Sequence, residues 1–349
     1  MSFRLKDTAE VLLLQTDQNR VLLKEVKVAF IGCGGIASAH VQRLSKIEGV
    51  RIVAGTDVDK SRQASFSGMS GASFYSDIHG MLEDARPDAV YVCTPPFARG
   101  VEIEAIEKGI PTFFEKPAGL TTQKAGEIRS AIKRRSLIHS VGYMWRYLDV
   151  TDRAIRELKE AGQAGLVIGQ WIDPFWFPQE HWWLHREMGG GQVLEQTTHV
   201  FDLARFLVGD VTRVSAEMDN ILVKRDRPNM TVEDFSAVTM RFKSGAIGVI
   251  YSSCASQNTF SGTALRVIAR DVVLEHTGHG KTLRVMKKDH VEEIRSQMDP
   301  LLEEDRIFVG AVRTGDTSGI RSSFDDGYKT LEVTVAANKA AADRVVVTL

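Results

Sequence analysis

A glycine-rich turn that joins an apolar run to a helical pattern constrains the fold of this chain more than any other feature. Residues 26–31 are apolar enough to form a buried strand, and residues 36–47 carry apolar side chains at helical spacing. The turn between them, Gly32-Cys33-Gly34-Gly35-Ile36-Ala37, satisfies the pattern G-x-G-x-x-G/A. A strand, such a turn and a helix in succession are typical of dinucleotide-binding domains.

The small residues of this turn each have a physical part in that interpretation. Gly32 permits the tight turn, Gly34 lets a pyrophosphate approach the backbone, and Ala37 lets the helix pack closely on the strand. Free amides at the start of the helix are then available to hold the phosphates. The pattern therefore predicts cofactor contacts from Gly32, Gly34, Gly35 and Ile36.

An acidic residue follows the second predicted strand, residues 51–56. Asp57 stands about 20 residues after Ala37, where a carboxylate can accept hydrogen bonds from the adenosine ribose and repel a 2′-phosphate. This favours NAD as the cofactor. Lys60 and Arg62 lie close in sequence and could hold that phosphate, so NADP stays open as an alternative. Asp57 could instead be only a helix cap or a turn residue.

The pattern of predicted elements changes once along the chain. Residues 25–145 alternate between strand-like and helical segments, which predicts a doubly wound parallel sheet, the Rossmann type of α/β domain. Residues 146–349 begin with a helix, include another at 193–208 and then run through successive strands. This predicts an α+β domain with an open, mainly antiparallel sheet. A helix near 326–342, which could pack back on the first domain, and a strand at 344–349 close the chain.

Composition excludes several classes of protein. The chain has 44 basic and 45 acidic residues and a net charge of −1, so no overall field attracts nucleic acid or an anionic membrane. Its apolar runs are of strand length, too short for a transmembrane helix or a secretion signal. Three scattered cysteines offer neither a disulfide framework nor a metal site, which favours the cytoplasm. Residues 1–24 are an N-terminal extension, a short hairpin or an unstructured segment, with no assigned function.

Several short blocks of residues follow one another in a fixed order after Val26: Cys93-Thr94-Pro95-Pro96, Glu115-Lys116-Pro117, Gly142-Tyr143-Met144-Trp145-Arg146, Gly189-Gly190-Gly191 followed by Glu195, His199 and Asp202, and the stretch from Ser322 to Gly327. On these blocks the sequence from Val26 onward resembles the Gfo/Idh/MocA family of oxidoreductases. Members usually have His where Arg99 stands and often Asp where Glu195 stands; the first departure concerns a cofactor contact, and the second lengthens an acidic arm but keeps its charge.

The resemblance implies a dehydrogenase that moves a hydride between a nicotinamide cofactor and a secondary alcohol or ketone of a sugar, polyol or related carbohydrate. It places Lys116 and His199 beside the reacting oxygen. Two other functions stay open: an enzyme that keeps its NAD and uses transient oxidation for glycoside cleavage or sugar–sugar redox, and an NAD-dependent sensor without catalysis. The resemblance also adds residues to the cofactor site, namely Thr94, Pro95, Arg99, Glu115 and Lys116.

Lys116 follows a predicted strand, so it lies at the carboxyl edge of the sheet, where ligands bind in such folds. A charged lysine there would stabilise a developing alkoxide. Burial and a nearby nicotinamide cation would lower the pKa of its ammonium group and help it exchange a proton near neutrality. The alternative is an ordinary surface lysine on a turn.

Glu195 and His199 stand four residues apart in the predicted helix 193–208 and would share one of its faces. We expect His199 to be an acid/base or to anchor a substrate oxygen, with Glu195 binding a substrate hydroxyl or orienting the imidazole. Asp202 would support the helix or a domain contact. A histidine satisfied in the core is the alternative. No metal is expected, since hydride transfer needs no Lewis acid and no second ligand cluster is present.

Aromatic and basic residues of the second domain are candidates for substrate binding. Trp176, Trp182 and Trp183 could pack on the apolar face of a sugar ring, or could simply cover the sheet. Arg146 is expected to hold substrate or cofactor. His181 and His185 have the spacing of a zinc pair, although a substrate-facing aromatic loop explains this segment better. The apolar face of an open sheet needs cover, which predicts a homodimer or homotetramer.

Overall fold

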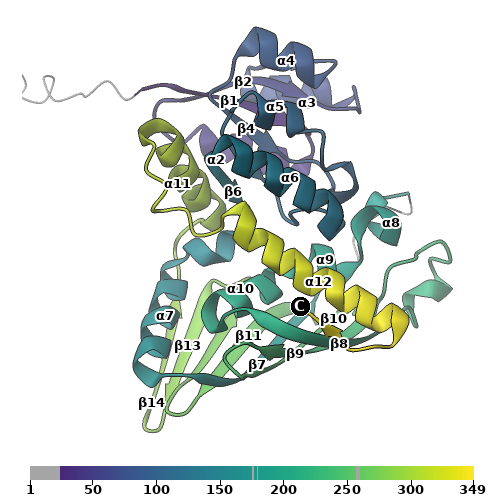
Figure 1. Ribbon diagram of the computed structural model, residues 1–349, viewed down its shortest axis with the longest axis vertical. Helices are drawn as coiled ribbons and strands as arrows, with labels where there is room; N and C mark the ends of the chain where they lie inside the picture. The colour runs from purple at the N-terminus through teal and green to yellow at the C-terminus, as the bar shows by residue number, and fades with distance from the viewer. Residues whose placement is uncertain (1–23, 175–176, 179, 257–259) are drawn as a thin grey trace, which may run out of the picture.

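The computed structural model describes residues 24–349 except 175–176, 179 and 257–259. Trp176 and nearly all of the N-terminal extension therefore lie outside the described residues. The chain forms two sheet-based domains, one above the other in Figure 1, and the chain crosses from the first to the second after β6. The two domains match the expected fold class, a Rossmann domain followed by an α+β domain.

The first sheet has six parallel strands in the order β3-β2-β1-β4-β5-β6. The strand order reverses between β1 and β4, and ligands of such folds bind at the carboxyl ends of the strands beside that point. The strands are β1 (Val26–Ile31), β2 (Val50–Thr56), β3 (Ser73–Tyr75), β4 (Ala89–Val92), β5 (Thr112–Phe114) and β6 (His139–Val141).

Helices cover both faces of this sheet, because alternate side chains of each strand point to opposite faces. In β1, Val28 and Phe30 pack with α2 and α3, whereas Ala29 and Ile31 pack with the helices of the other face. The helices are α2 (Gly35–Leu44) and α3 (Arg62–Ser70) on the first face, and α4 (Ile78–Ala85), α5 (Ile103–Glu107) and α6 (Thr122–Arg135) on the second.

The second sheet has nine strands in the order β14-β13-β12-β11-β7-β10-β9-β8-β15. Neighbouring strands are antiparallel except β7 and β10, which are parallel. The strands are β7 (Ala164–Ile172), β8 (Val211–Asp219), β9 (Phe235–Phe242), β10 (Ile247–Ser253), β11 (Gly262–Ala269), β12 (Val273–Thr277), β13 (Thr282–Lys287), β14 (His290–Arg295) and β15 (Val347–Thr348).

Among the described residues, helices cover only one face of the second sheet. On that face α7 (Asp149–Ala161) packs on β13, and α10 (Thr198–Val208) packs on β7 and β11. The other face carries partly exposed apolar side chains, among them Ile247, Val249 and Tyr251 of β10. This sheet therefore retains an apolar face toward solvent.

The last two helices connect the domains. Helix α11 (Pro300–Thr314) packs on α2 and β1, and α12 (Phe324–Asp343) contacts α6 of the first domain as well as α10 and β8 of the second (Figure 1). Neither α11 nor β14 is among the predicted elements. The buried face of α11 includes Glu304 and Asp305, which interrupt its apolar spacing, and every β14 residue is at least partly exposed.

Some predicted boundaries were wrong. The helix expected at 193–208 is two helices, α9 (Gln192–Glu195) and α10, separated by a turn at Gln196 and Thr197. The strand expected at 344–349 shrinks to the two residues of β15. Short helical turns complete the fold: η1 (Pro96–Ala98), η2 (Met144–Tyr147), η3 (Trp182–Leu184), α8 (Arg186–Gly189) and η4 (Val223–Arg225). Among the described residues, no helix combines the length and apolarity needed to span a bilayer.

Candidate active site

The glycine turn lies at the carboxyl end of β1 and has space for a ligand. Gly32 has a φ of +90°, and a Cβ there would come within 2.8 Å of the carbonyl carbon and oxygen of Cys93, so only glycine fits. Around Gly34 and Gly35 no atom of the described residues lies within 4 Å of an added Cβ. No side chain caps the start of α2, which leaves its first amides open toward this space. The turn therefore fits a dinucleotide pyrophosphate.

Asp57 is held against this turn at the end of β2. Its Oδ2 accepts a hydrogen bond from the Cys33 amide at 2.7 Å, and its Oδ1 accepts one from the Asp59 amide at 2.8 Å. Asp57 is thus a turn residue, as the alternative interpretation required, and its carboxylate also lies beside the open amides of α2. Of the two nearby cations, Arg62 pairs with Asp59 at 3.2 Å.

Lys116 and Glu195 meet at the junction of the two domains. Lys116 Nζ donates to Glu195 Oε1 at 2.5 Å and to the carbonyl oxygen of Glu195 at 2.9 Å. The other carboxylate oxygen of Glu195 accepts a hydrogen bond from Trp183 Nε1 at 2.9 Å. The side chains of Lys116 and Glu195 are 16% and 15% exposed, so the pair is mostly buried but still accessible to a ligand.

These contacts explain the break between α9 and α10. In a continuous helix the His199 amide would donate to the carbonyl oxygen of Glu195. Here that oxygen accepts from Lys116 Nζ, and the His199 amide turns to Gln196 O at 3.4 Å. Glu195 and His199 therefore do not share a helix face, contrary to the prediction from their four-residue spacing.

His199 lies among aromatic rings rather than beside a carboxylate. Its ring centroid is 5.3 Å from Trp145 and 6.0 Å from Trp171, with both rings nearly parallel to it. Nδ1 is buried and has no hydrogen-bond partner among the described residues. Burial, with smaller effects from the charges of Lys116 and His279, lowers the pKa of His199 well below its usual value. The imidazole is therefore neutral at neutral pH.

Arg146 and Asp202 belong to a buried ion-pair network instead of the site. Arg146 is 1% exposed, and its Nε and one terminal nitrogen donate to the two Asp202 oxygens at 2.7 and 2.6 Å. Its remaining nitrogen donates to Asp326 and to the carbonyl of Arg321. This guanidinium is buried, and four of its five N–H groups donate within the network, so the expected ligand-binding role of Arg146 is corrected to a structural one. Asp202 has the supporting part that was expected.

Two more predicted ligand-binding residues have other partners. Arg99 is buried and donates to the carbonyl oxygens of Val92, Glu115 and Pro117, and to Thr94 Oγ1 at 3.4 Å. It thus ties together the loops after β4 and β5 from below instead of facing a cofactor. Trp183 is 1% exposed, so its ring offers no face to a sugar, and its indole N–H serves Glu195.

Sequence reasoning missed the residues that support α9. The Glu233 carboxylate is buried, accepts a hydrogen bond from the Val193 amide at 2.9 Å and pairs with Arg186 at 2.7 Å. Its oxygens leave no room for a side chain at Gly191, where a Cβ would come within 2.5 Å. Glu233 therefore holds the start of the short helix that ends in Glu195, and no local pattern in the sequence marks it.

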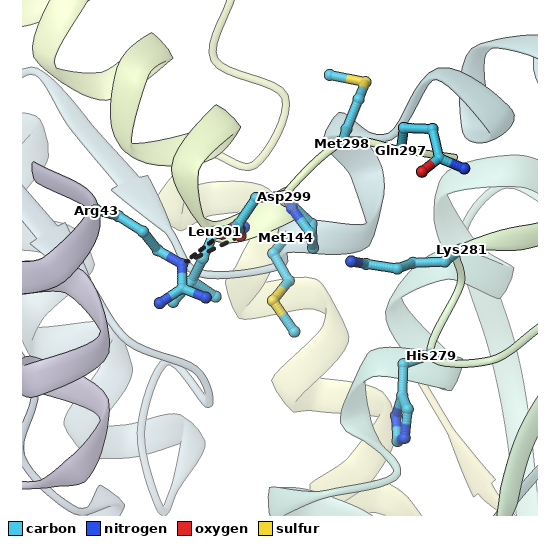
Figure 2. A pocket seen from close by; sticks show the side chains of 9 residues that line it. Arg43, Met144, His279, Lys281, Gln297, Met298, Asp299 and Leu301 are labelled. Atoms are coloured by element: carbon cyan, nitrogen blue, oxygen red, sulfur yellow. Dashed lines mark hydrogen bonds and ion pairs between the residues drawn. The ribbon is translucent and has the colours of Figure 1, made fainter. Parts of the chain in front are cut away.

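A cavity of about 310 Å³ is lined by residues of both domains. Figure 2 shows Arg43 of α2 reaching toward Asp299, while Lys281 and His279 approach from the turn before β13. None of the predicted catalytic residues lines this cavity. Its lining residues are Arg43, Met144, His279, Lys281, Gln297, Met298, Asp299, Pro300 and Leu301.

Two family descriptions match the chain. "Oxidoreductase family, NAD-binding Rossmann fold" matches residues 26–143, and "GFO/IDH/MocA C-terminal domain" matches residues 153–271. Together they cover more than half of the chain, and each falls on one of the two sheets.

Named relatives extend over most of the chain. It is 26% identical to a myo-inositol 2-dehydrogenase of Thermotoga maritima, over 91% of this chain and 97% of that protein. It is 29% identical to a scyllo-inositol 2-dehydrogenase (NAD(+)) of Bacillus subtilis, over 66% of this chain and 68% of that protein. A levoglucosan dehydrogenase solved in complex with NADH has the same fold, with a TM-score of 0.83, 19% identity, and coverage of 93% of this chain and 99% of that one.

Proposed function

Since this chain belongs to the Gfo/Idh/MocA family of oxidoreductases, whose N-terminal domain is an NAD-binding Rossmann fold, we propose that it dehydrogenates a secondary alcohol of a sugar, polyol or related carbohydrate, or runs the reverse reduction. The observation that carries this proposal is the contact of Lys116 with Glu195 at 2.5 Å, beside the neutral imidazole of His199.

The cofactor site in this proposal consists of the glycine turn and the loops that follow β4 and β5. Gly32 and Gly34 shape the turn, the amides of Gly35 and Ile36 would hold the phosphates, and the carboxylate of Asp57 would accept hydrogen bonds from the ribose hydroxyls. The carboxylate of Asp57 favours NAD over NADP, since a 2′-phosphate would repel it. When bound, NAD supplies the hydride acceptor or donor. Thr94, Pro95 and Lys116 border the nicotinamide end.

Lys116 has one hydrogen left for a substrate. An ammonium group has three donors, and two of them serve the carboxylate and the carbonyl of Glu195. The third can donate to the oxygen of the reacting carbon, where the positive charge stabilises a developing alkoxide. Glu195 fixes the direction of that donor, and its carboxylate can also accept a hydrogen bond from a neighbouring substrate hydroxyl.

His199 completes the proposed set. A neutral imidazole can accept the proton that the alcohol loses, and can return it in the reduction. The nearly parallel rings of Trp145 and Trp171 limit its rotation. The names of the relatives, two inositol dehydrogenases and a levoglucosan dehydrogenase, support a polyhydroxylated ring as the substrate.

A screen of inositols, anhydrosugars, aldoses and linear polyols tests this proposal. Each compound is incubated with the protein and NAD or NADP, and formation of the reduced nicotinamide is followed by absorbance. We expect turnover with a cyclic polyhydroxylated compound and a preference for NAD. If no member of these classes is oxidised, and no matching ketone is reduced, while NAD binds tightly, the proposed reaction is wrong.

We also propose a homodimer or homotetramer that buries the uncovered face of the second sheet, because Ile247 and Tyr251 expose 43% and 38% of their surface there. A cytoplasmic location is proposed from the cysteines. Cys33, Cys93 and Cys254 are all free and buried, as is usual in a reducing compartment.

A further inference from the structure

A buried cluster of ionisable side chains lies beneath the turn that carries Lys116, and the proposed mechanism does not use it. Its members are His40 of α2, Glu115 after β5, and Glu304 and Asp305 of α11. Their exposed fractions are 0%, 5%, 1% and 0%. Burying this many charges without function is costly unless they are paired, so their contacts need an explanation.

The contacts form a chain of hydrogen bonds that ends at the backbone of Lys116. His40 Nδ1 lies 2.8 Å from Asp305 Oδ1, and His40 Nε2 lies 2.9 Å from Glu115 Oε1. The second oxygen of Glu115 accepts a hydrogen bond from the Lys116 amide at 3.1 Å. Asp305, which starts this chain, is 265 positions from His40 in the sequence.

Both nitrogens of His40 face carboxylates, and the imidazolium form can donate to both of them. Burial opposes this charge, but the charges and hydrogen bonds of Asp305 and Glu115 outweigh burial and raise the pKa of His40 well above its usual value. A doubly donating ring between two fixed acceptors has no freedom to rotate. It therefore transmits the position of α11 to the carboxylate of Glu115.

Neighbouring residues restrict the carboxylate of Glu115 to one position. A Cβ at Gly142 would lie 3.1 Å from Glu115 Oε1, so glycine makes room for the carboxylate there. Arg99 holds the carbonyl oxygen of the same residue from the other side. Both the side chain and the carbonyl of Glu115 are thus fixed immediately before the peptide from which Lys116 extends.

We propose that His40 is a positioning residue for Lys116: Asp305 holds the imidazole, the imidazole holds the Glu115 carboxylate, and that carboxylate fixes the backbone from which the lysine reaches Glu195. This inference rests on the proposed function for its catalytic consequence. The structural claim is that the conformation of the Lys116 turn depends on His40 and α11. This dependence can be measured without a turnover assay.

A divalent metal is the competing explanation of this cluster. Ligand atoms of His40, Glu115 and Glu304 lie within 4.8 Å of one another, and both oxygens of Glu304 lack a partner among the described residues. Two observations favour the hydrogen-bonded chain. His40 and Glu115 already satisfy each other at 2.9 Å, and burial, followed by the nearby charge of Glu115, raises the pKa of Glu304, which disfavours the anionic carboxylate that a metal would need.

The test replaces His40 by Asn, whose shorter amide can reach at most one of the two carboxylates. His276→Asn is the matched control, because His276 is buried to the same degree but lies in β12 of the second domain. In the protein without added NAD, we expect His40→Asn to speed hydrogen exchange of the Lys116 amide at least about tenfold. The amides of β1 and β4 should keep their wild-type rates, and His276→Asn should not change exchange at Lys116.

Kinetics with the substrate found in the screen then measure the catalytic consequence. We expect His40→Asn to lower kcat about 10–100-fold, as is common for groups that orient a functional residue, with the Kd for NAD within about twofold of wild type. Glu115→Gln should have a similar effect, and the double variant should be no worse than the worse single variant, because all act through one chain. If His40→Asn unfolds the protein, Asp305→Asn provides the same readouts with a milder change.

Several outcomes overturn the proposal. A wild-type rate of hydrogen exchange at the Lys116 amide in a folded His40→Asn variant would contradict it. Equal acceleration of exchange at all amides would contradict it too, because that result would indicate a general loss of stability. A stoichiometric divalent metal in the purified protein, lost on Glu304→Gln, would establish the metal instead. Lys116→Ala distinguishes failure of the proposed function from failure of the positioning proposal. If Lys116→Ala keeps wild-type turnover, the proposed function is wrong. Hydrogen exchange at the amide of residue 116 in the His40→Asn variant still tests the positioning role of His40.

Discussion

Lys116 and Glu195, 79 positions apart in the sequence, meet through two hydrogen bonds, one to the carboxylate and one to the main-chain carbonyl of the glutamate. The second bond takes the place of a helical one, so the lysine of the first domain determines where α9 ends in the second. This joins the loop after β5 to the start of α10, and with it to His199. The two domains therefore share one site.

Lys116→Ala tests the catalytic assignment. The variant removes the ammonium group but none of the proposed contacts to the pyrophosphate and ribose. We expect turnover to fall by at least about 10²-fold, the lower range for losing a positioned acid or base, while NAD still binds with a Kd near wild type. Steady-state kinetics and fluorescence titration measure the two quantities. Wild-type turnover would refute the assignment.

Trp183→Phe tests whether the indole orients Glu195. The phenyl ring keeps most of the buried apolar surface but removes the N–H that donates to Glu195 Oε2. We expect about tenfold lower kcat, equivalent to about 1.4 kcal/mol, with the NAD affinity unchanged. The effect should vanish in a Glu195→Ala background, because that variant lacks the acceptor of the indole N–H. Equal losses in both backgrounds would point to packing instead.

Asp57→Asn tests the cofactor preference. The amide oxygen of asparagine can still accept from the Cys33 amide, while the bond from the Asp59 amide and the negative charge are lost. We expect the ratio of kcat/KM for NAD to that for NADP to fall at least about tenfold. A ratio equal to that of wild type would show that Asp57 does not select the cofactor.

The lowered pKa of the buried His276 predicts that the protein loses stability in acid. Burial lowers the pKa of His276 to about 4, whereas in the unfolded chain it lies near 6.5. Between these two pH values His276 is protonated in the unfolded chain but not in the folded chain. The free energy of unfolding therefore falls as the pH drops below about 6.5, and this loss levels off near pH 4. His276→Leu should reduce the loss by up to about 3 kcal/mol. Urea unfolding at pH 7 and pH 4.5 measures it, and identical pH dependence in both proteins would contradict it.

Ile247→Glu combined with Val249→Glu tests the proposed assembly. Both side chains point outward from β10, where a partner would bury them. We expect a dimeric or tetrameric mass for the wild type in light scattering and a monomeric mass for the variant, since burying two unpaired carboxylates is costly. Val291→Glu, on the edge strand β14, serves as the control and should keep the wild-type mass. A monomeric wild type would refute the assembly.

Features that depend on neighbouring residues can be predicted from local sequence patterns. The strand, turn and helix around Gly32, the alternation of elements up to β6 and the succession of strands after β8 follow from local periodicity and from glycine at a positive φ. The glycine turn was predictable because it is a short segment at a strand end.

The contacts between distant side chains depend on the three-dimensional fold. The break before α10, the indole of Trp183 on Glu195, the structural parts of Arg99 and Arg146, and the link from Asp305 through His40 to Glu115 all join segments far apart in the chain. Periodicity cannot reveal such contacts, because a buried polar side chain takes its partner from whichever segment the fold brings within hydrogen-bond distance. The same carboxylate or guanidinium thus binds a ligand or supports a loop according to its neighbours in space.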